Sequence, residues 1–259
     1  MTTSYQPRKE ERELAIKVAS ELGIPYYERK REGLSKMFSR LQRREAIVVT
    51  REGVRWEDHQ GRRFFFHPNM ATLRVQGMAQ GREDPLVKVA GLQPGDHVLD
   101  CTLGMGADAI VSAVAVGKQG RVVGVESVPA ICFLVKHGLK TYQTDDKLLE
   151  KGMRSIEVVC GDHRQYLASC KDRSFDVIFF DPMFRETVSA SSAMRALKPL
   201  ANDEPLEIET IEEAVRVARR RVVLKERKKS AEFARLGFQV LWESHTYALG
   251  VINVGERRG

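Results

Sequence analysis

The chain contains 259 residues, 42% hydrophobic and 30% charged, which suits a globular protein with one α/β domain and a smaller unit. No apolar run reaches the ~18 residues that span a bilayer, and the segment Met1–Glu13 is too polar for a secretory signal, so we expect a cytoplasmic protein without membrane contact. The net charge of +7 favours a polyanionic partner, because phosphate contacts release condensed counterions, although a solvated basic surface has the same composition.

Residues 1–75 are predicted to form a small N-terminal α+β subdomain. Apolar residues recur every four positions over Leu14–Leu22, and Gly23 follows as a stop, which indicates a first helix. Leu34–Leu41 has similar spacing and predicts a second helix. Short strands separated by glycine-containing turns are predicted at 46–50, 54–56 and 63–66.

Residues 76–259 predict a larger α/β domain with a Rossmann-like, mostly parallel sheet. Asp84 and Pro85 open a helix that runs to Ala90. Short apolar runs then alternate with helical stretches, as expected for strands buried on both faces of a parallel sheet. The predicted strands are 97–101, 121–126, 156–160, 175–181 and 221–225, and the predicted helices are 108–116, 129–142, 163–170 and 208–219. Segments 237–242 and 248–254 are expected to close the sheet as a terminal antiparallel pair, as in methyltransferases.

The loop after the first predicted strand of this domain is the sharpest feature of the sequence. The strand ends at Asp100, and the loop carries Thr102, Gly104 and Gly106 before a helix that starts near Asp108. Glycines let the backbone turn tightly and approach a ligand, and open α/β sheets bind ligands at this edge. The glycine spacing also fits a loose dinucleotide fingerprint. The two aspartates favour S-adenosylmethionine instead, because they would repel a pyrophosphate and attract a sulfonium and an amino group.

Acidic residues also follow the next two predicted strands. Glu126 ends the second strand, where a carboxylate can accept both ribose hydroxyls of an adenosine, a role that dinucleotide enzymes share. Asp162 and His163 follow the third strand, where Asp162 could meet the adenine amino group. Each acid alone would also fit a helix cap or a solvated strand end. Their repetition at successive strand ends predicts a site for S-adenosylmethionine.

The fourth predicted strand delivers Asp181, Pro182, Met183 and Phe184 to the same sheet edge. This motif resembles the Asp/Asn-Pro-Pro-Tyr/Phe tetrapeptide of methyltransferases that modify exocyclic amines of bases. The Asp181 carboxylate and the Pro182 carbonyl can accept the N–H groups of such an amine, and Phe184 offers a face on which the base can stack. An isolated Asp-Pro pair would equally mark a turn. The sequence therefore predicts catalysis by alignment of an unpaired or flipped-out base.

Several segments together carry a family resemblance: Leu22–Pro25, 46–56, Gly81–Leu92, Leu99–Ala109, Glu126-Ser127, Asp181–Phe184, Met194-Arg195 and Arg221–Lys225. The chain resembles the bacterial family that methylates a guanine-N2 amine in small-subunit ribosomal RNA (methyltransferase J-like), and within it a Gram-positive-type branch. The resemblance implies a class I methyltransferase fold, S-adenosylmethionine as cofactor and ribosomal RNA as partner. It also implies cofactor contacts at Ala107, Asp108, Glu126, Ser127, Asp162, His163 and Asp181.

The chain departs from the family pattern at three places, one of which is the segment Phe64–Met70, which has no close counterpart in the family. Arg185 stands where the family usually has proline, and Asp162-His163 stands where two serines are common. These departures concern the substrate rather than the cofactor. Arg185 and Arg195 flank the loop after the motif and are expected to hold RNA phosphates, and Lys225, at a predicted strand end, is expected to touch substrate.

Tyr26, Tyr27 and the basic residues Arg29–Arg31 form a mixture that suits RNA, although the tyrosines would equally fit the core. Most of the other basic residues are expected to be solvated.

The four cysteines are scattered, without a Cys-x-x-Cys pair: Cys101, Cys132, Cys160 and Cys170. We therefore expect neither a metal site nor a disulfide framework, and we expect Cys101 and Cys160 to be reduced core residues.

Three other functions remain open on the sequence alone. The protein could methylate a small molecule or another protein, it could be a non-catalytic RNA-binding protein that keeps a relic methyltransferase fold, or it could be an NAD-dependent oxidoreductase. Salt-dependent RNA binding would argue against the first, and S-adenosylmethionine binding would argue against the second and third.

Overall fold

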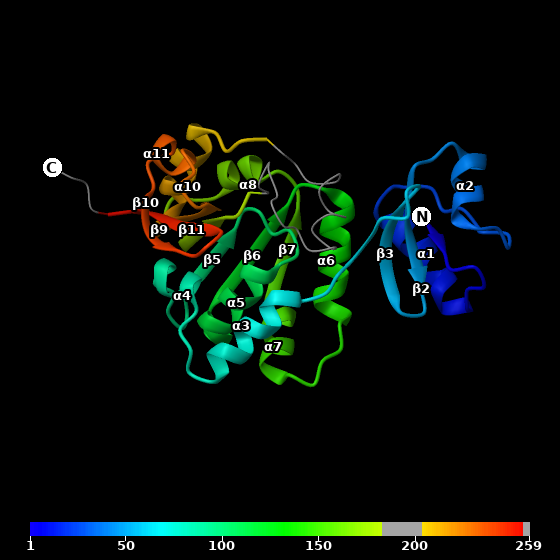
Figure 1. Cartoon of the computed structure of the whole chain (residues 1–259), viewed down its shortest axis with the longest axis horizontal. Coiled ribbons are helices and arrows are strands. Elements are labelled where there is room, and N and C mark those ends of the chain that lie inside the picture. Colours follow the sequence, from blue (N-terminus) through cyan, green and yellow to red (C-terminus); the bar gives the residue numbers. More distant parts are fainter. Residues whose placement is uncertain (183–203, 256–259) are drawn as a thin grey trace. The chain divides into compact units, whose positions relative to one another are not determined.

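The computed structural model describes residues 1–182 and 204–255 (Figure 1). The described residues form two compact units, of which the first comprises Met1–Phe66 and the second begins at His67. The second unit therefore begins earlier than the boundary that we predicted at residue 75. The reason is that the helix α3 (Asn69–Ala79) belongs to the second unit.

The first unit is a four-stranded sheet with two helices. The strands follow one another in the order β1 (Thr2–Thr3), β2 (Glu45–Thr50), β3 (Gly53–Asp58) and β4 (Arg63–Phe65). β1 is parallel to β2, and the other pairs are antiparallel. The helices are α1 (Lys9–Glu21) and α2 (Leu34–Leu41), both of which the apolar spacing predicted. This unit has the α+β composition expected from the sequence.

The second unit is built on a seven-stranded sheet in the order β10-β11-β9-β8-β5-β6-β7. Five neighbouring strands are parallel: β7 (Ile156–Cys160), β6 (Arg121–Glu126), β5 (His97–Asp100), β8 (Phe175–Phe180) and β9 (Ala218–Arg227). β11 (Tyr247–Asn253) is antiparallel to both β9 and β10 (Gln239–Glu243). The predicted Rossmann-like class, with its terminal antiparallel strand, is confirmed.

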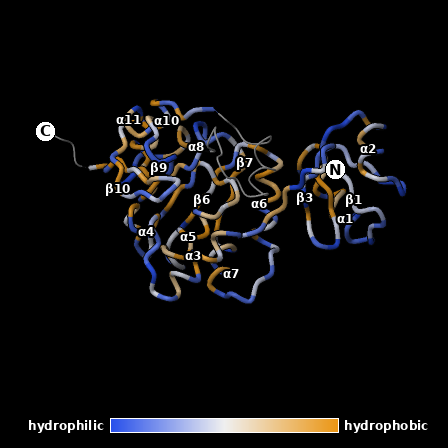
Figure 2. The backbone as a smooth tube through the Cα atoms, viewed as in Figure 1, coloured by the Kyte–Doolittle hydropathy of each residue, from blue (hydrophilic) through white to orange (hydrophobic). Residues whose placement is uncertain are grey.

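Helices cover both faces of this sheet, and hydrophobic residues concentrate in the central strands and the helices beside them (Figures 1 and 2). On one face, Leu167, Ala214 and Phe233 from three helices pack with strand residues that include Ile178 and Leu224. These helices are α8 (His163–Ser169), α10 (Ile208–Val217) and α11 (Glu232–Arg235). On the opposite face α4 (Pro85–Ala90) packs against β9 and β11, next to α5 (Ala107–Val116). The helix α6 (Pro129–Thr141) contacts β6 and β7, and a short 3-10 helix, η1 (Gly117–Gln119), leads into β6.

The helices α3 and α7 (Lys147–Ser155) were not predicted from the sequence, and neither were the short helices α11 and η1. The buried face of α3 consists of small residues such as Ala71 and Gly77, whereas its larger apolar residues Met70 and Leu73 are exposed, so its apolar pattern is blurred. In α7 the signal was present, because the Asp146 side chain caps the helix by accepting the Leu148 and Leu149 N–H groups.

Two details of the sheet differ from the prediction. β7 is an edge strand, so Glu157 and Cys160 are exposed and the expected burial on both faces is wrong for this strand. β9 begins at Ala218, so α10 ends at Val217, earlier than predicted.

Candidate active site

The loop that follows β5 has the glycine-dependent geometry expected of a cofactor loop. Gly104 and Gly106 both have positive φ values, +50° and +76°, which residues with a Cβ rarely adopt. Gly106 occupies the N-cap position of α5, so Asp108 lies in the first turn of the helix and is not its cap. Asp100 ends β5 with its side chain buried, and one carboxylate oxygen accepts the Thr102 N–H at 3.0 Å. The loop therefore presents backbone groups and a buried carboxylate at the carboxyl edge of the sheet.

Thr102 joins this loop to the end of β8. Its Oγ1 accepts the Asp181 N–H at 2.6 Å, and the neighbouring Cys101 N–H donates to the Phe179 carbonyl at 2.9 Å. β5 and β8 are adjacent parallel strands, which is why residues about 80 positions apart in the sequence meet here. The cofactor loop and the start of the Asp-Pro-Met-Phe motif are thus brought together.

Lys225, at the carboxyl end of β9, links two of the predicted acidic residues. Its Nζ donates to Asp108 Oδ2 at 2.9 Å and to Asp181 Oδ2 at 2.6 Å. The ammonium also lies over the Tyr247 ring, 5.3 Å from its centroid, in a cation–π contact. The amine that we expected to touch substrate is therefore held between two carboxylates.

Arg74 of α3 extends this cluster from the other side. One guanidinium nitrogen donates to Asp108 Oδ1 at 2.5 Å, and two others bind the carboxylate of Asp84 at 2.7 and 2.9 Å. Asp84 is also the N-cap of α4, where its side chain accepts the Leu86 N–H at 3.0 Å. A continuous chain of charges runs from α4 through α3 and α5 to the end of β8.

Burial and these contacts shift the pKa values of the cluster in opposite directions. Burial raises the pKa of Asp181, Lys225 opposes that rise and Asp108 adds to it, which leaves a value of about 6. For Asp108, burial is overcome by Lys225 and Arg74, which hold the pKa of that carboxyl well below its usual range. Burial, reinforced by Asp108, raises the pKa of Asp100 well above its usual range.

The charge balance of the cluster bears on what it can bind. Four carboxylates (Asp84, Asp100, Asp108 and Asp181) face two cations (Arg74 and Lys225), so the fully ionised cluster has a net charge of −2. The excess lies at Asp100 and Asp181, because Asp108 is paired on both oxygens within the chain. Arg74 and Lys225 therefore compensate the charge of Asp108, which was expected to attract the sulfonium. Burial raises the pKa of both Asp100 and Asp181, so a cation bound beside them, such as S-adenosylmethionine, would favour their ionised forms.

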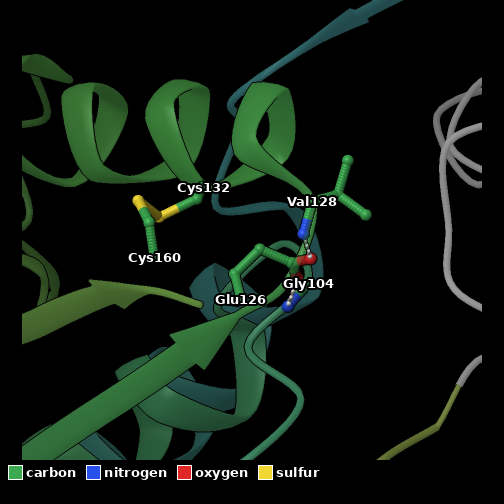
Figure 3. Close-up of a disulfide and its surroundings, with 5 residues drawn as sticks. All are labelled: Gly104, Glu126, Val128, Cys132 and Cys160. Atoms are coloured by element: carbon green, nitrogen blue, oxygen red, sulfur yellow. Dashed lines mark hydrogen bonds between the residues drawn. A yellow bond between two sulfur atoms is a disulfide. The ribbon is translucent and has the colours of Figure 1, made fainter. Parts of the chain in front are cut away.

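Glu126, at the end of β6, is held by the backbone on both oxygens (Figure 3). Its Oε2 accepts the Gly104 N–H at 3.0 Å and its Oε1 accepts the Val128 N–H at 2.9 Å. Burial raises the pKa of Glu126, while these N–H groups and that of Ser127 oppose the rise. Each carboxylate oxygen has a further lone pair for a ribose hydroxyl. Ser127 itself is exposed beside it.

Asp162 and His163 follow β7, where the Gly161 N–H donates to the Glu126 carbonyl at 2.9 Å. Asp162 is the N-cap of α8: its Oδ1 accepts the Arg164 N–H at 2.7 Å, and the Arg164 guanidinium pairs with its Oδ2 at 2.7 Å. His163 lies edge-on to the Phe180 ring, and burial lowers its pKa, which favours the neutral imidazole. Asp162 therefore caps a helix, which is the alternative role that the sequence left open for each acidic residue at a strand end.

A disulfide between Cys132 of α6 and Cys160 of β7 lies next to Glu126 (Figure 3). The expectation that no disulfide would form, with Cys160 a reduced core residue, is therefore wrong. α6 crosses from β6 to β7, which brings the two Cα atoms to 5.6 Å, and the sequence separation of 28 residues hides this proximity. Cys101 is a buried free thiol, as predicted.

Several predicted site residues lie outside the described part of the chain: Met183, Phe184, Arg185 and Arg195. Other residues of the site were not predicted. Arg74 was not recognised as a site residue because its helix, α3, was not predicted. Tyr247 comes close to Lys225 because β11 pairs with β9, which the sequence does not show locally. Asp84 was recognised only as a helix start.

The three arginines that open β9 do not belong to this site. Arg219 binds Asp176, Arg220 binds Asp96 and Arg221 binds the Val89 carbonyl, all at the amino ends of the strands. They were expected to be solvated, and they are instead engaged in structural contacts at the edge opposite Asp181.

A sequence model of the SAM-dependent methyltransferase family matches residues 46–245 of this chain. The chain belongs to this family. It is a SAM-dependent methyltransferase, and S-adenosylmethionine is its cofactor. The prediction from the motifs that the chain is a SAM-dependent methyltransferase is confirmed.

Named relatives of this methyltransferase fall into two groups. YpiP of Bacillus subtilis (strain 168) is 41% identical over 241 residues, which cover 93% of each chain. Ribosomal RNA small subunit methyltransferase J of Chromobacterium violaceum is 32% identical over 162 residues, 60% of this chain and 61% of that protein. The methyltransferase J of Dechloromonas aromatica is 31% identical over 171 residues, 64% of this chain and 67% of that one.

A solved structure supports the fold of the methyltransferase. The SAM-dependent methyltransferase NGO1261 from Neisseria gonorrhoeae superposes with a TM-score of 0.64 over 98% of this chain and 96% of its own, at 13% identity. Within residues 1–182 and 204–255, no helix is long and apolar enough to cross a membrane, and no group of three or more potential ligands is placed to hold a metal ion.

Proposed function

We propose that this methyltransferase modifies an exocyclic amine of an RNA base, the guanine N2 amine of small-subunit ribosomal RNA. The observation that carries the proposal is the position of Asp181, anchored by Thr102 and Lys225 beside the cofactor loop. Two relatives with matching segments are named as ribosomal RNA small subunit methyltransferases, and YpiP fits a Gram-positive-type branch of the same family. A cytoplasmic location follows from such a substrate.

The cofactor contacts are assigned to three neighbouring strand ends. Asp100 and the backbone of the loop would lie beside the amino acid part and the sulfonium, Glu126 and Ser127 beside the ribose, and Asp162 and His163 beside the adenine. Asp108 would act by holding Lys225. The complete proposed set is Asp100, Thr102, Gly104, Gly106, Ala107, Asp108, Glu126, Ser127, Asp162, His163 and Asp181.

The proposed chemistry depends mainly on alignment. S-adenosylmethionine, when bound, supplies an electrophilic methyl group. The Asp181 carboxylate and the Pro182 carbonyl accept the N–H groups of the target amine, which lets its nitrogen rehybridise and aim its lone pair. Lys225 keeps Asp181 in place and ionised, and it can touch the base. Met183 and Phe184 would complete the base pocket, and Arg185 and Arg195 would bind phosphates.

Replacing Asp181 tests this mechanism. Asp181→Ala removes the acceptor, while Lys225 keeps its partner Asp108, so the fold should persist. We expect methyl transfer to an RNA fragment containing the target to fall by on the order of 10²–10³-fold, as for loss of one aligned polar group. S-adenosylmethionine affinity, measured by calorimetry, should change little.

The matched control is Asp181→Asn, which keeps an oxygen acceptor but removes the charge. It should retain more activity than Asp181→Ala. Undiminished transfer by the alanine variant would contradict the proposed role. Transfer to a small molecule or a protein with no transfer to RNA would reject the substrate class while leaving the methyltransferase assignment intact.

A further inference from the structure

A short segment of the first unit carries a high density of positive charge. Residues 29–44 contain seven lysines and arginines and one acidic residue, Glu32, so the segment has a net charge of +6. A second segment, residues 219–229, has the same net charge of +6, but most of its cations bind carboxylates or carbonyls within the chain. Clustering of this kind is the electrostatic footprint of polyanion binding rather than of general solvation.

The fold holds the middle of this segment on a rigid base. In α2 the side chains of Leu34, Met37 and Phe38 are buried and pack against residues of β2. Lys36 and Arg40 are four residues apart, so they lie side by side on the exposed part of the helix. Charges fixed to a packed helix lose less conformational freedom on binding than charges on a loose tail.

Left-handed turns direct further basic residues outward at both ends of α2. Lys30 and Arg31 have φ values of +40° and +59°, a conformation that costs roughly 1–2 kcal/mol per non-glycine residue. Arg29 holds this turn, because its guanidinium donates to the Thr3 and Glu32 carbonyls at 3.2 and 3.0 Å. At the other end Gln42, with φ of +50°, caps the helix before Arg43 and Arg44. Strain kept at a charged turn is characteristic of a binding surface.

Five of these cations are available to a partner. Arg29 and Arg40 are used internally, since Arg40 pairs with Glu32. The remaining five are exposed, and none of them forms a salt bridge within the described parts of the chain: Lys30, Arg31, Lys36, Arg43 and Arg44. We call this group the α2 surface.

We propose that the α2 surface binds the phosphate backbone of the RNA substrate. The inference rests on the proposed function, and it adds RNA contacts in the first unit to those proposed beside the catalytic residues. RNA is favoured over an anionic membrane because the apolar face of α2 is buried in the core, so the helix has no apolar side to insert into a bilayer. Phosphate contacts would position the RNA without reading its sequence.

Neutralising three cations in the full-length protein tests this surface. The test variant carries Lys30→Gln, Lys36→Gln and Arg43→Gln. The control variant loses the same charge from exposed lysines of α1 and η1 and carries Lys9→Gln, Lys17→Gln and Lys118→Gln. Binding of a small-subunit ribosomal RNA fragment is measured against salt concentration.

Each lost phosphate contact lowers the slope of log K against log salt by about 0.7–0.9, so the test variant should lose about 2–3 units of slope. The control should match the wild type. In transfer assays the test variant should raise the KM for RNA while kcat and S-adenosylmethionine affinity stay unchanged, which shows that the catalytic unit is intact.

The outcomes separate this inference from the proposed function. Equal slopes for both variants, with salt-dependent binding by the wild type, would overturn the α2 surface alone. Loss of binding to phosphatidylserine vesicles with unchanged RNA binding would also overturn it, in favour of a membrane. A wild-type protein with no salt-dependent RNA binding would overturn the proposed function itself.

Discussion

Asp181 and Lys225 determine how the proposed reaction depends on pH. The Asp181 carboxyl has a pKa of about 6 because it is buried and lies near Asp108, with Lys225 opposing these effects. Protonation removes the negative charge and converts one carboxylate oxygen into a donor, so the side chain holds the N–H groups of an amine less strongly. Activity should therefore fall as the pH drops through about 6.

Removing the positive charge of Lys225 should move the acidic limb of the pH profile. In Lys225→Met the pKa of Asp181 should rise, so the acidic limb of kcat/KM should move to higher pH, whereas Lys225→Arg should stay close to the wild type. The pH profile of methyl transfer from pH 5 to 9 measures this. An acidic limb that does not move in the methionine variant would show that Lys225 does not tune Asp181.

For single residues, the sequence predicted which acidic side chains lie at the strand ends but not which cations they pair with. The acids at the strand ends were recognised because each ends an apolar run. Their pairing was hidden, because Arg74 and Lys225 reach Asp108 from elements far apart in the chain. Asp108, which was expected to face the cofactor, is paired with Arg74 and Lys225 in the structure.

The helix α3 connects the site to the rest of the second unit. Its Arg74 binds two buried carboxylates, Asp84 at the start of α4 and Asp108 in α5. Arg74→Met would leave Asp84 without its ion pair and Asp108 with Lys225 alone. Breaking a buried ion pair from one side costs about 3–5 kcal/mol, so we expect a loss of unfolding free energy of that order.

Urea unfolding followed by circular dichroism measures this loss as a shift of the transition midpoint. Arg74→Lys is the control, and it should lose less, because an ammonium can replace part of the contact but not the bidentate geometry. A midpoint unchanged in the methionine variant would mean that the cluster contributes little to stability.

Most elements with clear apolar periodicity were predicted, although α7 was missed despite its N-cap signal. The parallel strands alternate with helices at spacings that the sequence shows directly. α3 lacked this pattern because its buried side is made of small residues such as Ala71 and Val75. The edge position of β7, and with it the Cys132–Cys160 disulfide, depends on strand order rather than on local sequence.

At the scale of the whole molecule, we propose that the second unit carries out methyl transfer and that the α2 surface of the first unit adds affinity for RNA. Methylation of the target nucleotide in cells should therefore require this gene. Mass spectrometry of ribosomal RNA nucleosides from cells lacking it should show loss of one N2-methylguanine. A plasmid encoding the wild type should restore that nucleoside, and one encoding Asp181→Ala should not.

An unchanged nucleoside profile in cells lacking the gene would exclude small-subunit ribosomal RNA as the target. Restoration by the Asp181→Ala plasmid would instead point to a modification that needs the protein without its proposed catalytic carboxylate.

By itself the sequence determined the fold class, the family and the candidate residues, because apolar periodicity and short motifs are local properties of the chain. Only the tertiary structure decided which charges compensate one another, which cysteines meet and where β7 ends the sheet. Those outcomes depend on strand order and on contacts between distant segments, since Coulomb energies and thiol pairing follow distance in space rather than distance along the chain.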